Sequence, residues 1–255
     1  MFLKYVFFLI TTSLFSQSFF DTTINPIFIN ATTADDIYDL KFDSIQPYMY
    51  TTIPDLSNLT PIKKKEKFIS MILPAVLIEK AKIKSAYDYV SNNFDNVDYS
   101  DLNKSLYEYC NCTQTTDLIL CLYEQPNSII IAQAAIESGW GTSRFFLEGF
   151  NLFGIHSYSK NTDKIKANSS LISSPVYVKK YDNISSSVSH YLRTLAKGYA
   201  YSEFRQKRIK DLPIEKLIRY LINYSERREL YVENLRTIID YNNLTKYDTL
   251  KINWK

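Results

Sequence analysis

The chain has few glycines, histidines and cysteines. Among 255 residues it has 5 glycines, 2 histidines and 3 cysteines. His156 and His190 are far from the cysteines in sequence, and the cysteine spacing matches no zinc pattern, so we expect neither a metal centre nor a cofactor. Because glycine is rare, its positions carry more weight. Four of the glycines fall within residues 139–154.

A strong charge of either sign is also missing. The formal net charge of +3 is weaker than the concentrated basic face of a typical nucleic-acid-binding domain, so we expect no nucleic-acid partner. Hydrophobic residues make up 45% of the chain. That share is enough for one sizeable core or two.

The apolar stretch at the N-terminus is short for a membrane span. Lys4 precedes apolar residues 5–15, and small polar residues follow at 16–18. This pattern is typical of a secretory signal peptide, with an uncleaved anchor or a buried helix as alternatives. We expect residues 1–18 to be removed, leaving an exported protein of the periplasm or cell envelope, or a secreted one, with no stable membrane span.

Export changes the interpretation of Cys110, Cys112 and Cys121. In an oxidising compartment, one bridge from Cys110 or Cys112 to Cys121 would tie a short loop to the helix that follows. A cysteine nucleophile is the alternative, but no histidine lies nearby in sequence to lower a thiol pKa. We therefore expect the cysteines to be structural.

The remaining chain is predicted to be mainly α (α+β). Residues 19–59 are rich in Thr, Asp and Pro without a sustained period, which predicts an extended N-terminal arm or linker. Alternation at residues 175–182 predicts a strand. Hydrophobic spacing predicts helices at residues 63–90, 128–137, 185–198, 214–224 and 229–241. We expect one helical domain with a small β lobe at residues 60–245, followed by a tail at 246–255.

Glu137 ends an apolar run just before the first glycines. In the last turn of a helix at 128–137, the negative end of the helix dipole disfavours an ionised carboxylate. Burial between Trp140 and Phe153 would act in the same direction and raise the pKa of Glu137. A carboxyl group that keeps its proton near neutral pH suits general acid catalysis. The structural alternative is a helix C-cap with Glu137 paired to Arg144.

The sequence around Glu137 resembles a known family. AQAAIESGWGTSRFFLEGFNLFG is similar to the core signature of bacterial glucosaminidases of glycoside hydrolase family 73, in particular their Bax-like branch. Three further segments resemble parts of that branch in the same order. They are KKKEKFISMILPAVL, VYVKKYDNISSSVSHYLRTL and YSERRELYVENLRTIIDYNNL. Together the four segments span residues 60–245.

The resemblance implies a lysozyme-like helical fold with a β-hairpin lobe beside a groove for peptidoglycan glycan strands. It implies hydrolysis of the β-1,4 bond between N-acetylglucosamine and N-acetylmuramic acid. Glu137 matches the family's general acid, and Tyr224 in YSER matches the motif tyrosine beside it. Core packing is the alternative for the aromatic residues. The residues that we expect to contact the substrate are Trp140, Gly141, Asn151, Phe153 and His156.

The position of a second carboxylate is less clear. Glycosidases normally use one as base or nucleophile, and related enzymes place a glutamate in the hairpin after NLFG. Between Glu148 and Glu203 this chain has only Asp163 and Asp182. Asp182 suits a helix N-cap, which leaves Asp163 as the candidate and Glu148 as a reserve. Assistance by the substrate's acetamido group, or inefficient catalysis, are the alternatives.

Two other functions stay open from sequence. A lytic transglycosylase would use one acid and leave an anhydro-muramic end, whereas a non-catalytic envelope protein would bind the glycan without cutting it. The basic cluster Lys63, Lys64 and Lys65 is either a solvated helix start or a contact for anionic wall polymers. His190 is expected to be structural.

Overall fold

A computed structural model describes residues 19–20, 24–100, 103–158, 163–167 and 176–252. The signal peptide expected at residues 1–18 lies outside the described residues. Among the helices that are described, none combines the length and the apolar composition that a bilayer crossing requires.

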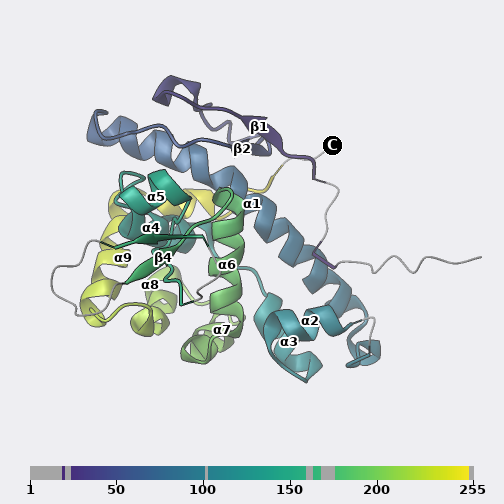
Figure 1. Ribbon diagram of the computed structural model, residues 1–255. Coiled ribbons are helices and arrows are strands. Elements are labelled where there is room, and N and C mark those ends of the chain that lie inside the picture. Colours follow the sequence, from purple (N-terminus) through teal and green to yellow (C-terminus); the bar gives the residue numbers. More distant parts are fainter. Residues whose placement is uncertain (1–18, 21–23, 101–102, 159–162, 168–175, 253–255) are drawn as a thin grey trace, which may run out of the picture.

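The described chain is mainly helical, as the hydrophobic spacing predicted, and the long helix α1 crosses the molecule (Figure 1). The α-helices are α1 (Pro61–Asn92), α2 (Lys104–Cys110), α3 (Thr115–Leu122), α4 (Asn127–Ser138), α5 (Arg144–Gly149), α6 (Ile184–Lys197), α7 (Ser202–Arg208), α8 (Ile214–Leu217) and α9 (Glu229–Tyr241). Short 3-10 helices are η1 (Ala34–Asp36), η2 (Phe94–Asn96), η3 (Tyr199–Tyr201), η4 (Ile218–Tyr224) and η5 (Leu244–Tyr247).

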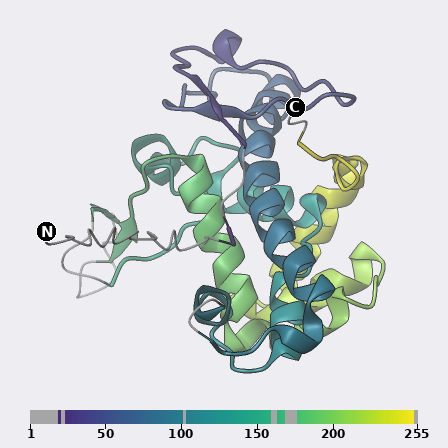
Figure 2. The ribbon, with the colours of Figure 1, turned by 90° about the vertical axis from the view of Figure 1, so that its right-hand side faces the viewer.

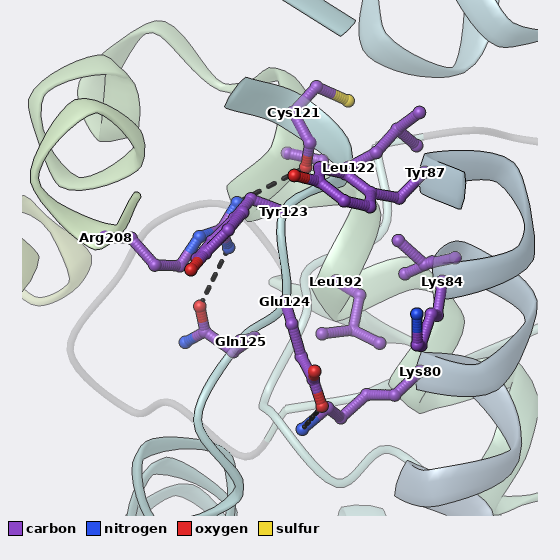
Figure 3. A pocket seen from close by; sticks show the side chains of 12 residues that line it. Lys80, Lys84, Tyr87, Cys121, Leu122, Tyr123, Glu124, Gln125, Leu192 and Arg208 are labelled. Atoms are coloured by element: carbon purple, nitrogen blue, oxygen red, sulfur yellow. Dashed lines mark hydrogen bonds and ion pairs between the residues drawn. The ribbon is translucent and has the colours of Figure 1, made fainter. Parts of the chain in front are cut away.

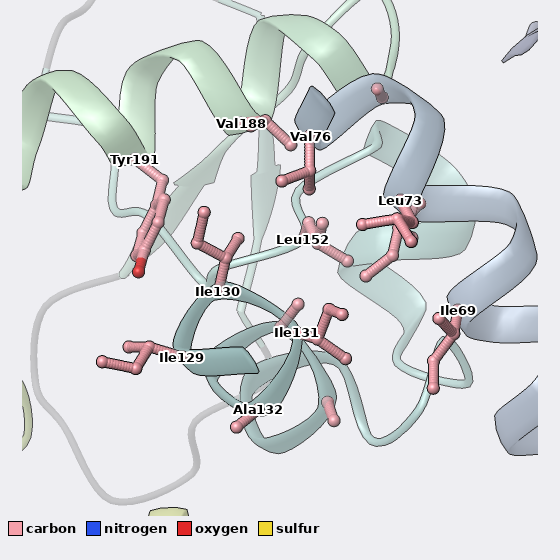
Figure 4. Close-up of a cluster of buried hydrophobic side chains, with 14 of the residues drawn as sticks. Ile69, Leu73, Val76, Ile129, Ile130, Ile131, Ala132, Leu152, Val188 and Tyr191 are labelled. Carbon is pink, nitrogen blue, oxygen red and sulfur yellow. The ribbon is translucent and has the colours of Figure 1, made fainter. Parts of the chain in front are cut away.

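The core forms where α1, α4 and α6 meet. Pro61 occupies the first turn of α1, where its missing N–H costs nothing, and the Thr60 hydroxyl accepts a hydrogen bond from the Lys63 N–H. α4 is apolar on nearly every side and is buried throughout its first turns. Figure 4 shows side chains from the three helices meeting, among them Val76, Ile130 and Val188.

The helix predicted at 214–224 is an α-helix followed by a 3-10 helix. The spacing predicted a continuous helix at 214–224, but α8 ends at Leu217 and η4 continues as a 3-10 helix. A 3-10 helix has three residues per turn, so Ile218, Leu221 and Tyr224 fall on one face. Ile218 and Leu221 are buried, and the tight winding therefore directs Tyr224 toward the same core.

Residues 24–59 are largely extended and pack against the helices. Strand β1 (Ile27–Ile29) pairs in parallel with β2 (Tyr48–Tyr50), and the pair lies along α1 (Figures 1 and 2). The buried apolar residues of this segment are spaced irregularly, so the sequence shows no helical or strand period. They include Ile37, Tyr50 and Leu56. The tail is likewise packed, since Ile252 forms a bridge with Ile45.

The predicted β lobe is a hairpin of β3 (Lys164–Lys166) and β4 (Tyr177–Lys179), which are antiparallel. The far edge of β4 also takes a bridge from His156 to Val178, so the chain after NLFG is fixed to the hairpin. In Figure 2 the hairpin projects from one side of α6 while α1 lies on the other. The Tyr181 hydroxyl after β4 contacts His190 Nδ1 on α6 at 2.8 Å.

A disulfide joins Cys110 at the end of α2 to Cys121 in α3, one of the two pairings left open by the sequence. Cys112 is a free thiol. Burial raises the pKa of the Cys112 thiol to about 11, so its thiolate is scarce at neutral pH. The alternative of a cysteine nucleophile is therefore disfavoured.

Candidate active site

Glu137 lies in the last turn of α4, as the sequence predicted. Gly139 closes the helix in the left-handed conformation at φ 58°, and its N–H donates to the Ala135 carbonyl. Glu137 is half-buried. It therefore stands at the carbonyl end of a buried helix, where both the helix dipole and desolvation oppose its negative charge.

The turn after Glu137 is tightly constrained. Gly139, Trp140 and Gly141 all have positive φ, at 58°, 57° and 83°. A Cβ on Gly141 would lie 2.8 Å from Cδ2 of Phe68, closer than real Cβ contacts. Gly141 is buried. It is thus required for packing against α1 and does not present open backbone to a substrate, contrary to our expectation.

The environment of Glu137 raises its pKa. Desolvation by burial is the largest effect, and it outweighs a hydrogen bond from the Tyr231 side chain and the positive charge of Arg227, which both lower the pKa. No acidic group of the described chain is among these influences. Burial thus favours the protonated carboxyl, while Tyr231 and Arg227 favour its ionised form.

A buried polar chain orients the tyrosine that contacts Glu137. Gln133 lies one turn earlier on α4, and its Nε2 donates to the Tyr231 hydroxyl at 3.0 Å. The Tyr191 hydroxyl donates to Gln133 Oε1 at 2.5 Å. Because Gln133 donates to the Tyr231 oxygen, the Tyr231 proton is free to be donated to Glu137.

Tyr231, rather than Tyr224, makes this hydrogen bond. The Tyr224 ring stacks on the Tyr231 ring, with centroids 5.5 Å apart and planes 13° apart. Burial raises the pKa of Tyr224 well above its usual value, and the nearby charge of Glu137 adds to the effect. From sequence, Tyr231 belonged to the apolar face of α9. Its hydroxyl was the feature that could have indicated a polar role, because a buried tyrosine usually has a hydrogen-bond partner.

The NLFG loop lies against Glu137. Gly154 has φ +65°, and a Cβ built there would be 3.6 Å from Oε2 of Glu137. Phe153 is buried at 3% exposure and stacks on Tyr191 with centroids 3.9 Å apart. Phe153 therefore packs into the core, and the loop approaches the carboxylate through the backbone of Gly154.

Asn151 fixes that loop to the hairpin. Its Nδ2 donates to the carbonyls of Ile155 at 2.9 Å and Lys179 at 2.8 Å, and its Oδ1 accepts from the Ile155 N–H at 2.9 Å. The side chain is buried and both its amide protons are used. Asn151 is therefore a positioning residue, where we had expected contact with the substrate.

His156 and Asp163 lie on the hairpin side. Both side chains are exposed. The Asp163 carbonyl accepts from the Lys180 N–H at 3.0 Å, while no contact within the described residues joins its carboxylate to Glu137. The N-cap of α6 is Asn183, whose Oδ1 accepts from the Ser186 N–H, so the capping role expected of Asp182 belongs to its neighbour.

Arg144 does not pair with Glu137. Its guanidinium lies 3.2 Å from Glu148, one turn along α5, and donates to the Lys166 carbonyl of β3 at 2.6 Å. An i,i+4 ion pair satisfies Arg144 locally and ties α5 to the hairpin. Glu148, the reserve acid, is thereby engaged in an exposed ion pair.

A cavity of the described chain lies away from these residues. It has a volume of about 140 Å³ between α1, α3 and α6, and none of the predicted site residues lines it (Figure 3). Buried Arg208 donates there to Gln125 Oε1 and to the carbonyls of Leu120 and Cys121. Arg208 thus closes the C-terminal end of α3 and stabilises the fold.

Two solved structures resemble the chain. The catalytic domain of the autolysin Auto from Listeria monocytogenes is 23% identical, with a TM-score of 0.42 and coverage of 63% of this chain and 96% of that one. A peptidoglycan hydrolase from Sphingomonas sp. A1 is 22% identical, with a TM-score of 0.38 and coverage of 46% and 76%.

Sequence comparison finds a relative and a matching family model. Protein Bax of Escherichia coli (strain K12) is 32% identical over 115 residues, 42% of this chain and 39% of that protein. The match thus spans less than half of that relative's length. Residues 119–244 match the Glucosaminidase family model, described as mannosyl-glycoprotein endo-beta-N-acetylglucosaminidase. The residues that match this family model carry Glu137 and its tyrosine partner.

Proposed function

We propose that this protein is a peptidoglycan hydrolase that cleaves the β-1,4 bond between N-acetylglucosamine and N-acetylmuramic acid. The supporting observation is Glu137 itself, a half-buried carboxyl of raised pKa within the residues that match the Glucosaminidase family model. The resemblance to the Bax-like branch supplies the substrate class. The disulfide between Cys110 and Cys121 fits an oxidising compartment, so we place the activity at the cell envelope after export.

In this mechanism Glu137 is the general acid. Protonated Glu137 donates its proton to the glycosidic oxygen as the bond to the anomeric carbon breaks, and the carboxylate that remains accepts the hydrogen bond from Tyr231. That bond strengthens as Glu137 becomes charged, so Tyr231 favours the product side of proton transfer. Burial provides the opposing effect, which keeps the proton on Glu137 beforehand.

Asp163 is our candidate for the second carboxylate, as base or nucleophile toward the anomeric carbon. Asp163 is exposed on the hairpin, where its carboxylate is accessible to substrate. In this role the substrate places one sugar in contact with both the hairpin and Glu137. Trp140 and His156 would then border the groove on its two sides, and Tyr224 would support Tyr231 from behind.

A second candidate function follows because no second acid of the described chain influences Glu137. The alternative is a lytic transglycosylase. There the bond that breaks joins the anomeric carbon of muramic acid to the oxygen of the next N-acetylglucosamine. Glu137 first protonates that oxygen and then accepts the proton of a hydroxyl of the muramic acid, whose oxygen attacks the anomeric carbon and closes the anhydro ring. This route needs no second carboxylate.

The test is digestion of purified peptidoglycan by the exported chain, with the ends of the products identified by reduction and mass spectrometry. Reducing N-acetylglucosamine ends that disappear with Glu137→Gln support the hydrolase, and loss with Asp163→Asn as well would assign the second carboxylate. Glu203→Gln, an exposed acid of α7, is the matched control. Anhydro ends would favour the transglycosylase, and no release by the unmodified protein would refute both.

A further inference from the structure

Lys65 near the start of α1 lies between two aromatic rings. Its Nζ is 5.1 Å from the centroid of the Trp140 ring and 4.8 Å from that of Tyr241, and it donates to Asn242 Oδ1 at 2.8 Å. No acidic side chain of the described chain forms an ion pair with it. An ammonium group has three protons to donate, so Lys65 can still bind an anion.

Trp140 is held in this place at a cost. It has φ +57°, a left-handed backbone conformation that bulky residues rarely adopt. Phe68 lies beneath it with centroids 5.7 Å apart, and the close approach of Gly141 to Phe68 fixes the turn. The constraint keeps the half-exposed Trp140 ring beside Lys65.

Tyr241 completes the cluster from α9. Its side chain is 81% exposed. Among the described residues, the Tyr241 ring has one cation-π contact, with the Lys65 ammonium, and stacks on no other ring. Aromatic rings with a few polar groups beside them are typical of ligand-binding surfaces. A pyranose ring offers an apolar face of C–H groups that packs on such rings.

The cluster begins beside Glu137 at Trp140 and extends away from it along α9 to Tyr241. Trp140 follows Glu137 by three residues, whereas Tyr241 lies ten residues beyond Tyr231 on α9. At about 1.5 Å of rise per residue, this places Tyr241 about 15 Å along the helix from the tyrosine that contacts Glu137. A glycan strand held at Glu137 could therefore reach the cluster with a different sugar unit.

We propose that Lys65, Trp140 and Tyr241 form a remote subsite for an acidic unit of the glycan strand. The two rings pack on the sugar, and the Lys65 ammonium binds a carboxylate, carried either by the free lactyl group of a peptide-free muramic acid or by the peptide of a substituted one. This inference rests on the proposed function, because it takes its substrate class from there.

Binding is tested apart from cleavage. In a Glu137→Gln background, binding to insoluble peptidoglycan is measured by sedimentation for Lys65→Met, Tyr241→Ser and the control Lys63→Met, an exposed neighbour. Loss of one charged hydrogen bond that is partly exposed to solvent predicts binding about 5-fold weaker for Lys65→Met, with an effect under about 2-fold for Lys63→Met. Tyr241→Ser tests the rings, since Trp140 variants would disturb packing on Phe68.

Two modified substrates identify the carboxylate. Strands stripped of peptide by an amidase carry the lactyl carboxylate alone, and esterified peptidoglycan carries none. Because the lactyl carboxyl is an amide in peptide-bearing units and becomes a free carboxylate only on stripped strands, an effect of Lys65→Met that is confined to stripped strands assigns the lactyl group, and one that is confined to peptide-bearing strands assigns the peptide. Equal binding by Lys65→Met and Lys63→Met, or an unchanged effect on esterified material, would overturn the subsite. Failure of the unmodified protein to cleave, with Lys65-dependent binding retained, would refute only the proposed function.

Discussion

Tyr231→Phe removes one hydroxyl from the candidate site and keeps the ring. That hydroxyl is the hydrogen-bond partner of Glu137 that lowers its pKa, against the raising effect of burial. Hydrogen bonds to charged groups contribute about 1.5–3 kcal/mol, and we take about 1 kcal/mol because Glu137 is only half-buried. At about 1.36 kcal/mol per pKa unit, the pKa of Glu137 should rise by about 0.7.

The sign of the pH effect follows from the role of Glu137. A general acid must be protonated, so kcat/KM falls as pH rises through its pKa. The alkaline limb of the profile should therefore move upward in Tyr231→Phe, while the maximal rate falls because the ionised product of proton transfer loses its partner. The assay is release of soluble fragments from peptidoglycan across a pH series.

The same substitution has a cost for stability. Gln133 Nε2 donates to the Tyr231 hydroxyl, and Gln133 is fully buried, so Phe leaves a buried donor without a partner. That costs about 1–3 kcal/mol in free energy of unfolding. Tyr199→Phe, at a tyrosine that is 93% exposed, is the control for loss of a hydroxyl. An alkaline limb that stays in place or moves to lower pH would refute the assignment of Tyr231 as the partner of Glu137.

Further predictions concern the acid and its supports. Because burial raises the pKa of folded Glu137, its stabilising contribution is present below the ordinary glutamate pKa of 4.5 and is lost at higher pH; Glu137→Gln should thus melt above the unmodified protein at pH 8, with a gap that closes near pH 4 in thermal scans. Asn151→Ala should cost about 2–3 kcal/mol in denaturant titration and reduce cleavage, because three hydrogen bonds to the loop are lost; unchanged cleavage would contradict a positioning role. Gly141→Ala should lower Tm because of the φ of +83° and the clash with Phe68; an unchanged Tm in a thermal scan would refute the packing role of Gly141. Cys112→Ser should leave cleavage unchanged, and an inactive variant would revive a thiol mechanism.

Much of the helical framework could be predicted from the sequence because local patterns encode it. The apolar period at 229–241 gives α9 with the bounds that the structure has, and the glycine two positions after the predicted helix at 128–137 marks the end of α4. Glu137 could be placed in the last turn for the same reason. The spacing of these residues along a helix fixes their relative positions before any tertiary contact forms.

The arm, the tail and the hydrogen-bond partners could not be predicted in this way. Residues such as Ile37 and Ile252 are buried singly, by contacts with distant parts of the chain, so they leave no period in the sequence. Asn151 was expected to contact the substrate because no local sequence pattern shows that its side-chain amide donates hydrogen bonds to the carbonyls of Ile155 and Lys179.

The sequence by itself determined that a carboxyl group would stand at the end of a buried helix in a turn rich in glycine. Only the tertiary structure decided which groups surround it. Tyr231 reaches Gln133 across 98 residues of sequence, and Lys65 reaches Asn242 across 177. Helical spacing acts over a few residues, whereas these contacts exist only after α1, α4 and α9 have packed together, because burial of their apolar faces fixes which polar side chains meet.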